Sequence, residues 1–199
     1  IGLNECRGGP QLDYMVENLA SDYAYVNIDD DHGGYNPIFF KKDKFELLAS
    51  GRFFLNADDL TQPILSWDNS NGNYRFTAWV KLRLKASGEI LFFFETHLDH
   101  QGETARNEQA RINMEQIRKI AAGFPAIICG DHNASKSRVP YFNMKSAYMD
   151  DSYSVAKTKY NVEQGVGTLC KHKVNGRDFW DPAYKGSSRL DYIWVRGID

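Results

Sequence analysis

The sequence predicts a layered α/β domain in which parallel and antiparallel strand pairing are mixed. Three observations support this class. Short apolar strands are spread over most of the chain, only a few segments have helical periodicity, and a single helix separates two strongly apolar strands, as in a β-α-β crossover. The 199 residues suit one domain or at most two small ones. A composition of 42% hydrophobic and 25% charged residues excludes a disordered chain and a coiled coil.

The first third of the chain is predicted to contain one helix, several strands and a long loop. Pro10 opens the helix, whose apolar residues then recur at i, i+3, i+4 and i+7 on one face. Strands are expected at 23–28, 37–42 and 45–50, the last two pairing as a hairpin. The polar segment 56–73 is expected to be a long loop, and long loops within compact domains tend to be functional.

The remaining strands differ in their patterns. Residues 75–85 alternate strictly between apolar and polar side chains, which predicts one buried face and one wet face. Residues 90–96 form a continuous apolar run, typical of a strand covered on both faces. A helix at 103–122 has an apolar inner stripe and leads into a short buried strand at 126–129. The last strand is predicted at 190–196.

Polar side chains that could form a site lie at the ends of these apolar strands. They are Glu5 near the start, His97 and Asp99 after the phenylalanine run, Asp131 and Asn133 after 126–129, and Asp191 at the start of the last strand. Asp191 alternates in phase with the apolar residues of its strand, so we expect its carboxylate to be partly desolvated. Carboxylate and amide oxygens suit Mg²⁺, Mn²⁺ or Ca²⁺ rather than zinc. A hard cation beside a base, an amide and an imidazole fits phosphoester hydrolysis.

Each of these residues also has an ordinary structural interpretation. Glu5 alone is as well explained as a surface or capping carboxylate, and His97 as a hydrogen-bonded core histidine. Gly130 and Asp131 could form a turn in which Asn133 satisfies backbone groups. Their joint occurrence in this order is what favours a site.

The order of four motifs resembles the endonuclease/exonuclease/phosphatase superfamily, which has the fold of deoxyribonuclease I. The motifs are Gly2-Leu3-Asn4-Glu5, Thr96-His97-Leu98-Asp99-His100, Gly130-Asp131-His132-Asn133 and Arg189-Leu190-Asp191-Tyr192-Ile193. The resemblance covers nearly the whole chain and implies a four-layer α/β/β/α sandwich, with two packed mixed sheets flanked by helices. It also implies a metal-dependent hydrolase that cleaves a phosphodiester or phosphomonoester by attack of an activated water.

The resemblance implies a role for each site residue. Glu5 matches the family's metal-binding glutamate, and Asp131 is expected to share the Mg²⁺ (or Mn²⁺) ion. His97 matches a residue that contacts the scissile phosphate or assists the leaving group. Asp131 and Asn133 match the pair that activates water and binds phosphate, while Asp191 matches the aspartate that orients a catalytic histidine. The predicted site residues are therefore His97, Asp131, Asn133 and Asp191 as catalytic, Asn133, His97, Arg75 and Trp67 as substrate contacts, and Glu5 and Asp131 as metal ligands.

The sequence departs from the family pattern at several positions. The family's asparagine before Glu5 and its Ser-Asp-His segment after Asp191 lie outside the 199 residues, so we expect a single domain, 1–199, that lacks both parts. His132 stands where the family has phenylalanine, and Gly34 where many relatives have a glutamate that would pair with His97. These departures motivate an alternative: a degenerate member that binds a phosphorylated ligand without cleaving it.

Three further features have alternative interpretations. Trp67 in the long loop could stack on substrate, whereas Trp79 could simply cover the sheet. The acidic run Asp29-Asp30-Asp31-His32 could hold a structural cation but is more typical of a solvated loop. Cys170-Lys171-His172 is a weak zinc signal because the sequence has no second such pair.

Charge and hydropathy narrow the range of partners. The 24 basic and 26 acidic side chains give a net charge of −2, which offers no support for DNA, although nucleic acid stays among the candidate substrates. The longest apolar run, 90–94, is far shorter than the ~18 residues needed to span a bilayer. We expect a monomer that acts on a phosphorylated substrate. Three cysteines without C-x-x-C spacing do not identify the compartment.

Overall fold

The elements were located in a computed structural model, which describes residues 1–6, 8–29, 36–69, 72–145, 148–159, 168, 173–174, 177–178 and 188–198. The helices are α1 Pro10–Leu19, α2 Glu103–Ala121, α3 Val139–Met144 and α4 Ser152–Val155. The strands are β1 Tyr23–Val26, β2 Ile38–Lys41, β3 Phe45–Phe54, β4 Phe76–Leu84, β5 Ile90–His97, β6 Ala126–Asp131, β7 Asp150–Asp151, β8 Lys173–Val174, β9 Arg177–Asp178 and β10 Asp191–Arg196.

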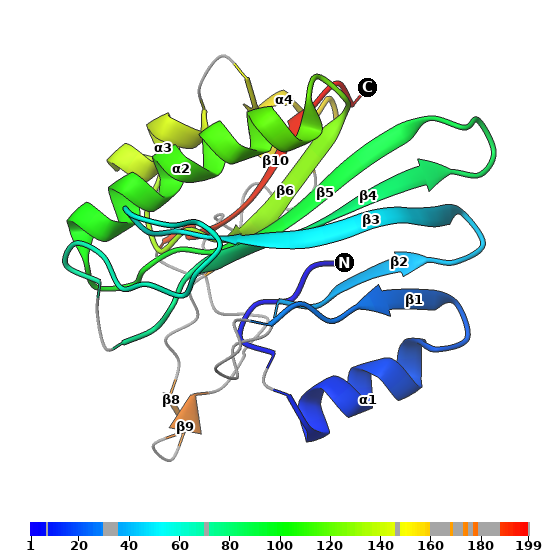
Figure 1. Ribbon diagram of the computed structural model, residues 1–199, viewed down its shortest axis with the longest axis horizontal. Helices are drawn as coiled ribbons and strands as arrows, with labels where there is room; N and C mark the ends of the chain where they lie inside the picture. Colours follow the sequence, from blue (N-terminus) through cyan, green and yellow to red (C-terminus); the bar gives the residue numbers. More distant parts are fainter. Residues whose placement is uncertain are drawn as a thin grey trace.

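Four layers stack on one another, which confirms the predicted α/β/β/α sandwich (Figure 1). Helices α2 and α3 cover one face of a six-stranded sheet. The small sheet of β1 and β2 lies against the other face, and α1 forms the outer layer beyond it. Within the described part of the chain, no helix has the length and apolar character needed to cross a membrane.

The six-stranded sheet has mixed pairing and contains the predicted crossover. Its strand order is β3-β4-β5-β6-β10-β7. Among the described strands of this sheet, only β5 and β6 are parallel, and α2 connects them, as expected for a β-α-β unit. The other pairs are antiparallel, including β6 with β10, so the last strand lies beside the strand that ends in Asp131.

The predicted hairpin between 37–42 and 45–50 is wrong. Strand β2 pairs with β1, whereas β3 pairs with β4 and extends to Phe54, so residues 42–44 connect the two sheets. The reason is that β2 is apolar on both faces. Ile38 and Phe40 pack between the sheets, and Phe39 packs against α1. In the small sheet both faces of β2 are covered, by the six-stranded sheet on one side and by α1 on the other.

Three apolar cores separate the four layers. The largest lies between the helices and the six-stranded sheet, where Phe94 and Ile117 are fully buried. The second lies between the sheets, and the third, which includes Leu12, lies under α1. Residues 90–96 are therefore covered on both faces, as predicted, because Phe94 faces the helices while Phe93 packs against the core between the sheets.

The expected wet face of residues 75–85 exists only at one end of β4. Arg83 is exposed, but Thr77 is fully buried because α2 covers that part of the strand. There the Thr77 hydroxyl lies 2.5 Å from Asn113 Oδ1 and 2.9 Å from Thr96 Oγ1. Asn113 Nδ2 also donates to Thr96 Oγ1 at 3.0 Å, so a buried polar network joins the helix to β4 and β5.

Candidate active site

Three predicted site residues lie on adjacent strands of the six-stranded sheet. His97 is opposite Asp131 in the parallel β5–β6 pair, and Asp131 is opposite Asp191 in the antiparallel β6–β10 pair. Because neighbouring strands lie roughly 5 Å apart, the three residues form a row across the sheet.

A glycine allows two of these strands to approach. Gly130 directly precedes Asp131, and a Cβ atom at this position would lie 1.8 Å from the carbonyl oxygen of Thr96. Any side chain would therefore push β6 away from β5. This close contact explains why glycine stands before the aspartate.

Glu5 approaches the row from the N-terminal segment. Asn4 Nδ2 donates to the Thr96 carbonyl oxygen at 2.9 Å, which attaches this segment to the end of β5. Glu5 itself is exposed, with a φ of 54°. Its negative charge and that of Asp191 both contribute to the electrostatic environment of Asp131.

The electrostatic state of Asp131 reflects these charges. Burial and, to a smaller extent, the charges of Asp191 and Glu5 raise the pKa of Asp131 to about 6, against the lowering effects of the Asn133 N–H and Arg75. An excess of carboxylate charge with hard oxygen donors is what a Mg²⁺ or Mn²⁺ ion would neutralise, so the donor set fits the expected cation. Among the described residues, however, no three His, Cys, Asp or Glu side chains are arranged closely enough to hold one ion by themselves.

Asn133 holds both Asp131 and His97. Its backbone N–H donates to Asp131 Oδ1 at 2.7 Å, and its φ of 48° is one that asparagine tolerates well. Its Nδ2 group lies 3.1 Å from the Leu98 carbonyl oxygen and 3.1 Å from His97 Nε2. Because the Leu98 carbonyl oxygen can only accept, the atom of the Asn133 amide that faces it must be the nitrogen, which donates. It follows that His97 Nε2 accepts, and the proton of the neutral ring sits on Nδ1.

His97 is uncharged in this arrangement. Burial and, to a smaller extent, the positive charge of Arg75 lower its pKa to about 3. Asp131 Oδ2 lies 3.8 Å from His97 Nε2. This distance is too long for a hydrogen bond, and neither atom carries a hydrogen to donate. The ring is therefore a neutral acceptor held in place by Asn133.

Arg75 lies beside the same residues, just before β4. Burial lowers its pKa, while Asp99, Asp131 and Glu5 raise it. Its Nη2 atom is 3.2 Å from His100 Nδ1. Its Nε atom is buried and has no hydrogen-bond partner among the described residues.

Two predicted residues differ from expectation or lie apart from this cluster. The expected partial burial of Asp191 is wrong: its side chain is exposed, because Tyr192 and Trp194 occupy the covered face of β10. Trp67 is 38% exposed on the long loop. The next residue, Asp68, accepts from the backbone N–H groups at the start of α2, which places Trp67 near the connection that follows β5.

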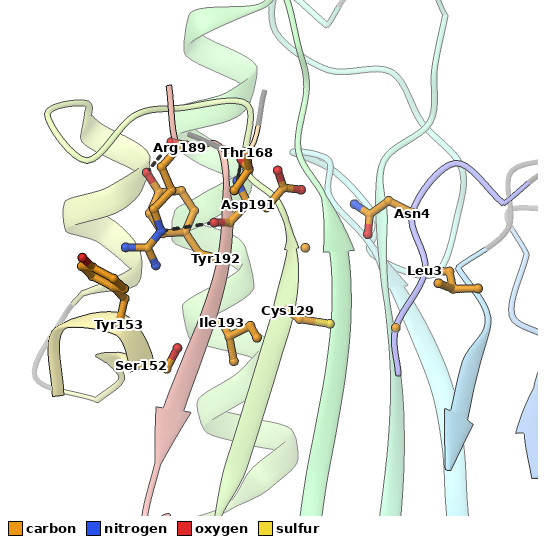
Figure 2. Close-up of a pocket in the computed structure, with 12 residues that line it drawn as sticks. Leu3, Asn4, Cys129, Ser152, Tyr153, Thr168, Arg189, Asp191, Tyr192 and Ile193 are labelled. Carbon is orange, nitrogen blue, oxygen red and sulfur yellow. Dashed lines mark hydrogen bonds between the residues drawn. The ribbon is translucent and has the colours of Figure 1, made fainter. Parts of the chain in front are cut away.

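A pocket of about 460 Å³ borders the row of site residues (Figure 2). The N-terminal segment forms one wall, and β6, β10 and α4 supply the others. Asn4 and Asp191 lie at one end of it, on opposite walls. Of the predicted site residues, Asp191 lines the pocket, whereas Asp131 is represented there only by its neighbour Gly130.

Arg189 holds the start of β10. It donates to both carboxylate oxygens of Asp151, at 2.6 and 2.9 Å, and its guanidinium lies 4.4 Å from the ring centre of Tyr192. Asp151 is 2% exposed and also accepts from the Tyr141 hydroxyl. This bidentate pair fixes the backbone that leads into Asp191.

Sequence reasoning missed the polar residues of α2 that support the site. Gln109 Oε1 accepts from the backbone N–H of Asp99 at 2.8 Å, and Asn113 belongs to the network under Thr96. Both are fully buried. Their spacing of four residues within the apolar stripe was the available signal, since a polar residue on the inner face of a helix needs a partner. Gly34, the run 30–32 and residues 170–172 lie outside the described residues.

Comparisons with known proteins identify the family of this chain. The family model described as the Endonuclease/Exonuclease/phosphatase family matches residues 1–199. The chain therefore belongs to the endonuclease/exonuclease/phosphatase family. Among curated proteins, no match was found.

Solved structures of similar proteins share the fold. A family member from Bacteroides thetaiotaomicron is 29% identical with a TM-score of 0.79, and the alignment covers 98% of this chain and 67% of that one. The mannosyl-6-phosphatase of the same species is 28% identical with a TM-score of 0.76, covering 94% and 67%. The catalytic domain of human Nocturnin, with bound sulfate, is 20% identical with a TM-score of 0.62, covering 94% and 64%, and shows the fold alone. This chain thus spans about two thirds of the length of these proteins.

Proposed function

We propose that this protein is a divalent-cation-dependent phosphoester hydrolase in which an activated water attacks the phosphorus. The observation that carries the proposal is the row of His97, Asp131 and Asp191 on three adjacent strands, and the raised pKa of Asp131, about 6, supports it. A carboxylate with this pKa is ionised at neutral pH and is a better base than an ordinary aspartate. Similarity to a mannosyl-6-phosphatase supports phosphoester chemistry.

Each residue has a part in this proposal. Asp131 accepts a proton from the attacking water, and Glu5 and Asp191 strengthen it as a base through their charges. Asn133 fixes the Asp131 carboxylate and the His97 ring, which holds both in one orientation. Glu5 and Asp131 would hold the cation. When bound, Mg²⁺ or Mn²⁺ would neutralise charge on the phosphoryl oxygens.

The experiment compares the wild type with two variants on 4-nitrophenyl phosphate and bis(4-nitrophenyl) phosphate, with Mg²⁺ and with EDTA. Loss of the general base in Asp131→Asn should lower kcat by about 10²- to 10⁴-fold. Glu5→Gln should weaken Mn²⁺ binding, measured by calorimetry. The exposed Asp58 lies in the long loop, and its Asn variant serves as the matched control.

The outcomes separate the alternatives. Turnover that survives EDTA, or that is unchanged in Asp131→Asn, would refute the mechanism. Phosphate binding without any turnover would instead support the degenerate, non-catalytic reading, which His132 at the family's phenylalanine position motivates.

A further inference from the structure

The side-chain amide of Asn133 decides which nitrogen of His97 carries the proton. Asn133 Nδ2 lies 3.1 Å from His97 Nε2 and 3.1 Å from the Leu98 carbonyl oxygen. An amide can turn over, and a ring nitrogen can donate or accept, so the contact with His97 alone leaves both tautomers open. The Leu98 carbonyl oxygen can only accept. This oxygen therefore orients the amide, and the amide keeps the proton of the neutral ring on Nδ1.

The other end of the same peptide group is held by α2. The peptide group that contains the Leu98 carbonyl also contains the N–H of Asp99, which donates to Gln109 Oε1 at 2.8 Å. Leu98, Asp99 and Gln109 are fully buried, so this N–H depends on a protein acceptor. Because the N–H and the carbonyl of one planar peptide group turn together, Gln109 sets the direction of the Leu98 carbonyl.

The neighbouring peptide groups are held without Gln109. The N–H of Leu98 donates to the Asp131 carbonyl oxygen at 2.9 Å. The carbonyl oxygen of Asp99 accepts from Arg106 Nη1 at 2.9 Å. Gln109 therefore acts on the 98–99 peptide group and not on the whole connection after β5. Hydrogen bonds in a chain polarise one another, so the bond from the N–H to Gln109 also strengthens the carbonyl as an acceptor.

We infer that Gln109 is a positioning residue that selects the tautomer of His97 through the 98–99 peptide group and the Asn133 amide. Without the Gln109 acceptor, the buried N–H would turn toward another partner and draw the Leu98 carbonyl away from Asn133 Nδ2. The amide would then be free to turn over and place its oxygen against His97 Nε2, which would take the ring proton.

The change of tautomer would reach the proposed reaction through Asp131. Asp131 Oδ2 lies 3.8 Å from His97 Nε2. A proton on Nε2 would point toward this carboxylate and compete for it with the attacking water. This kinetic consequence rests on the proposed function, whereas the selection of the tautomer by Gln109 does not.

The first test measures the tautomer of His97 from the nitrogen-15 chemical shifts of its ring at pH 7, with His97→Gln identifying the signals. Gln109→Met keeps the length of the side chain and removes the amide oxygen. Gln109→Glu keeps an oxygen for the Asp99 N–H and replaces Nε2, which has no partner among the described residues. The wild type and Gln109→Glu should carry the proton on Nδ1, whereas Gln109→Met should shift it wholly or partly to Nε2.

The second test is the hydrolysis of 4-nitrophenyl phosphate in Mg²⁺. Gln109→Met should lower kcat about 10-fold and change KM less than about 3-fold, because catalytic groups are misplaced while substrate contacts remain. Gln109→Glu should restore most of kcat. Ile117→Val is the matched control, since it removes one methyl group from a fully buried residue about two turns further along α2. It should change neither kcat nor the tautomer.

The outcomes separate this inference from the proposed function. A wild-type ring with its proton on Nε2, or a Gln109→Met ring with its proton still on Nδ1, would overturn the inference. The same change of tautomer in Ile117→Val would also overturn it, because loosened packing of α2 would then suffice. If the wild type hydrolyses no ester, the proposed function fails, and the tautomers still decide the role of Gln109. Circular dichroism checks folding, and Gln109→Asn, whose shorter side chain withdraws the acceptor, replaces Gln109→Met if that variant does not fold.

Discussion

Replacing Glu95 with glutamine is expected to stabilise the protein increasingly as the pH rises. Glu95 lies on β5, is completely buried, and has no hydrogen-bond partner for either carboxylate oxygen among the described residues. Burial raises its pKa well above the ordinary value of 4.5. Glutamine has the same shape and cannot ionise, so the two proteins differ mainly in the cost of that one charge.

The sign and the slope of this pH dependence follow from the linkage between proton binding and unfolding. Below pH 4.5 the carboxyl is protonated in both folded and unfolded chains, and the two proteins should have nearly equal free energies of unfolding. Above it, the unfolded wild type ionises while the folded form holds its proton. Wild-type stability then falls by about 1.4 kcal/mol per pH unit relative to the variant, until the pH reaches the folded-state pKa.

The assay is urea unfolding of both proteins at pH 4, 5, 6 and 7. The difference between the two free energies cancels every other titrating group, and it should be near zero at pH 4 and grow with pH. Glu17→Gln, at an exposed position of α1, is the control and should show a flat difference. A flat difference for Glu95→Gln as well would refute the reasoning, because it would mean that the folded carboxyl is ionised and solvated or paired.

Three further substitutions test the packing around the site. Asp151→Ala should lower the free energy of unfolding by about 3–5 kcal/mol in urea titrations, because it leaves the Arg189 guanidinium without its bidentate partner; a loss under about 1 kcal/mol would contradict this. Gly130→Ala should abolish folding or strongly lower the melting temperature, since its Cβ would overlap the Thr96 carbonyl oxygen, and a wild-type melting curve would disprove that contact. His132→Phe should raise the free energy of unfolding by about 1–3 kcal/mol, because both ring nitrogens are buried without partners in the described structure; a destabilised variant would show that they have them.

The individual elements could be predicted because their hydrophobic patterns are local. The continuous apolar run of β5 and the helical stripe of α2 are both properties of neighbouring residues, and both match the structure closely. Pairing is different, since it joins residues far apart in the chain. The error at 37–42 and 45–50 arose because a short turn between two strands resembles a hairpin, whereas β2 pairs with β1 and β3 pairs with β4, so this turn joins strands of different sheets.

The site could be predicted as a set of residues but not as a hydrogen-bonded arrangement. Motif order indicated that His97, Asp131 and Asp191 belong together, and the strand register brings them side by side. The motif order could not indicate that the Asn133 amide would donate to His97 Nε2, because that contact depends on the left-handed backbone of Asn133. The exposure of Asp191 could not be predicted from the sequence either. Alternation gives two faces, and tertiary packing decides which one the helices cover.

Several of the buried polar atoms that have no partner among the described residues lie near the candidate site, although Asn69, Tyr148 and Trp194 carry others. Glu95 lies two residues before His97, His132 lies next to Asp131, and Arg75 Nε lies beside both strands. In a fold selected for stability alone, apolar residues would serve better at such positions, because each orphaned group costs free energy. Proteins violate local packing rules mainly where function requires it. Glu95 and His132 have no part in the proposed hydrolysis. The free energies of unfolding of Glu95→Gln and His132→Phe therefore measure how much these two buried polar side chains destabilise the protein.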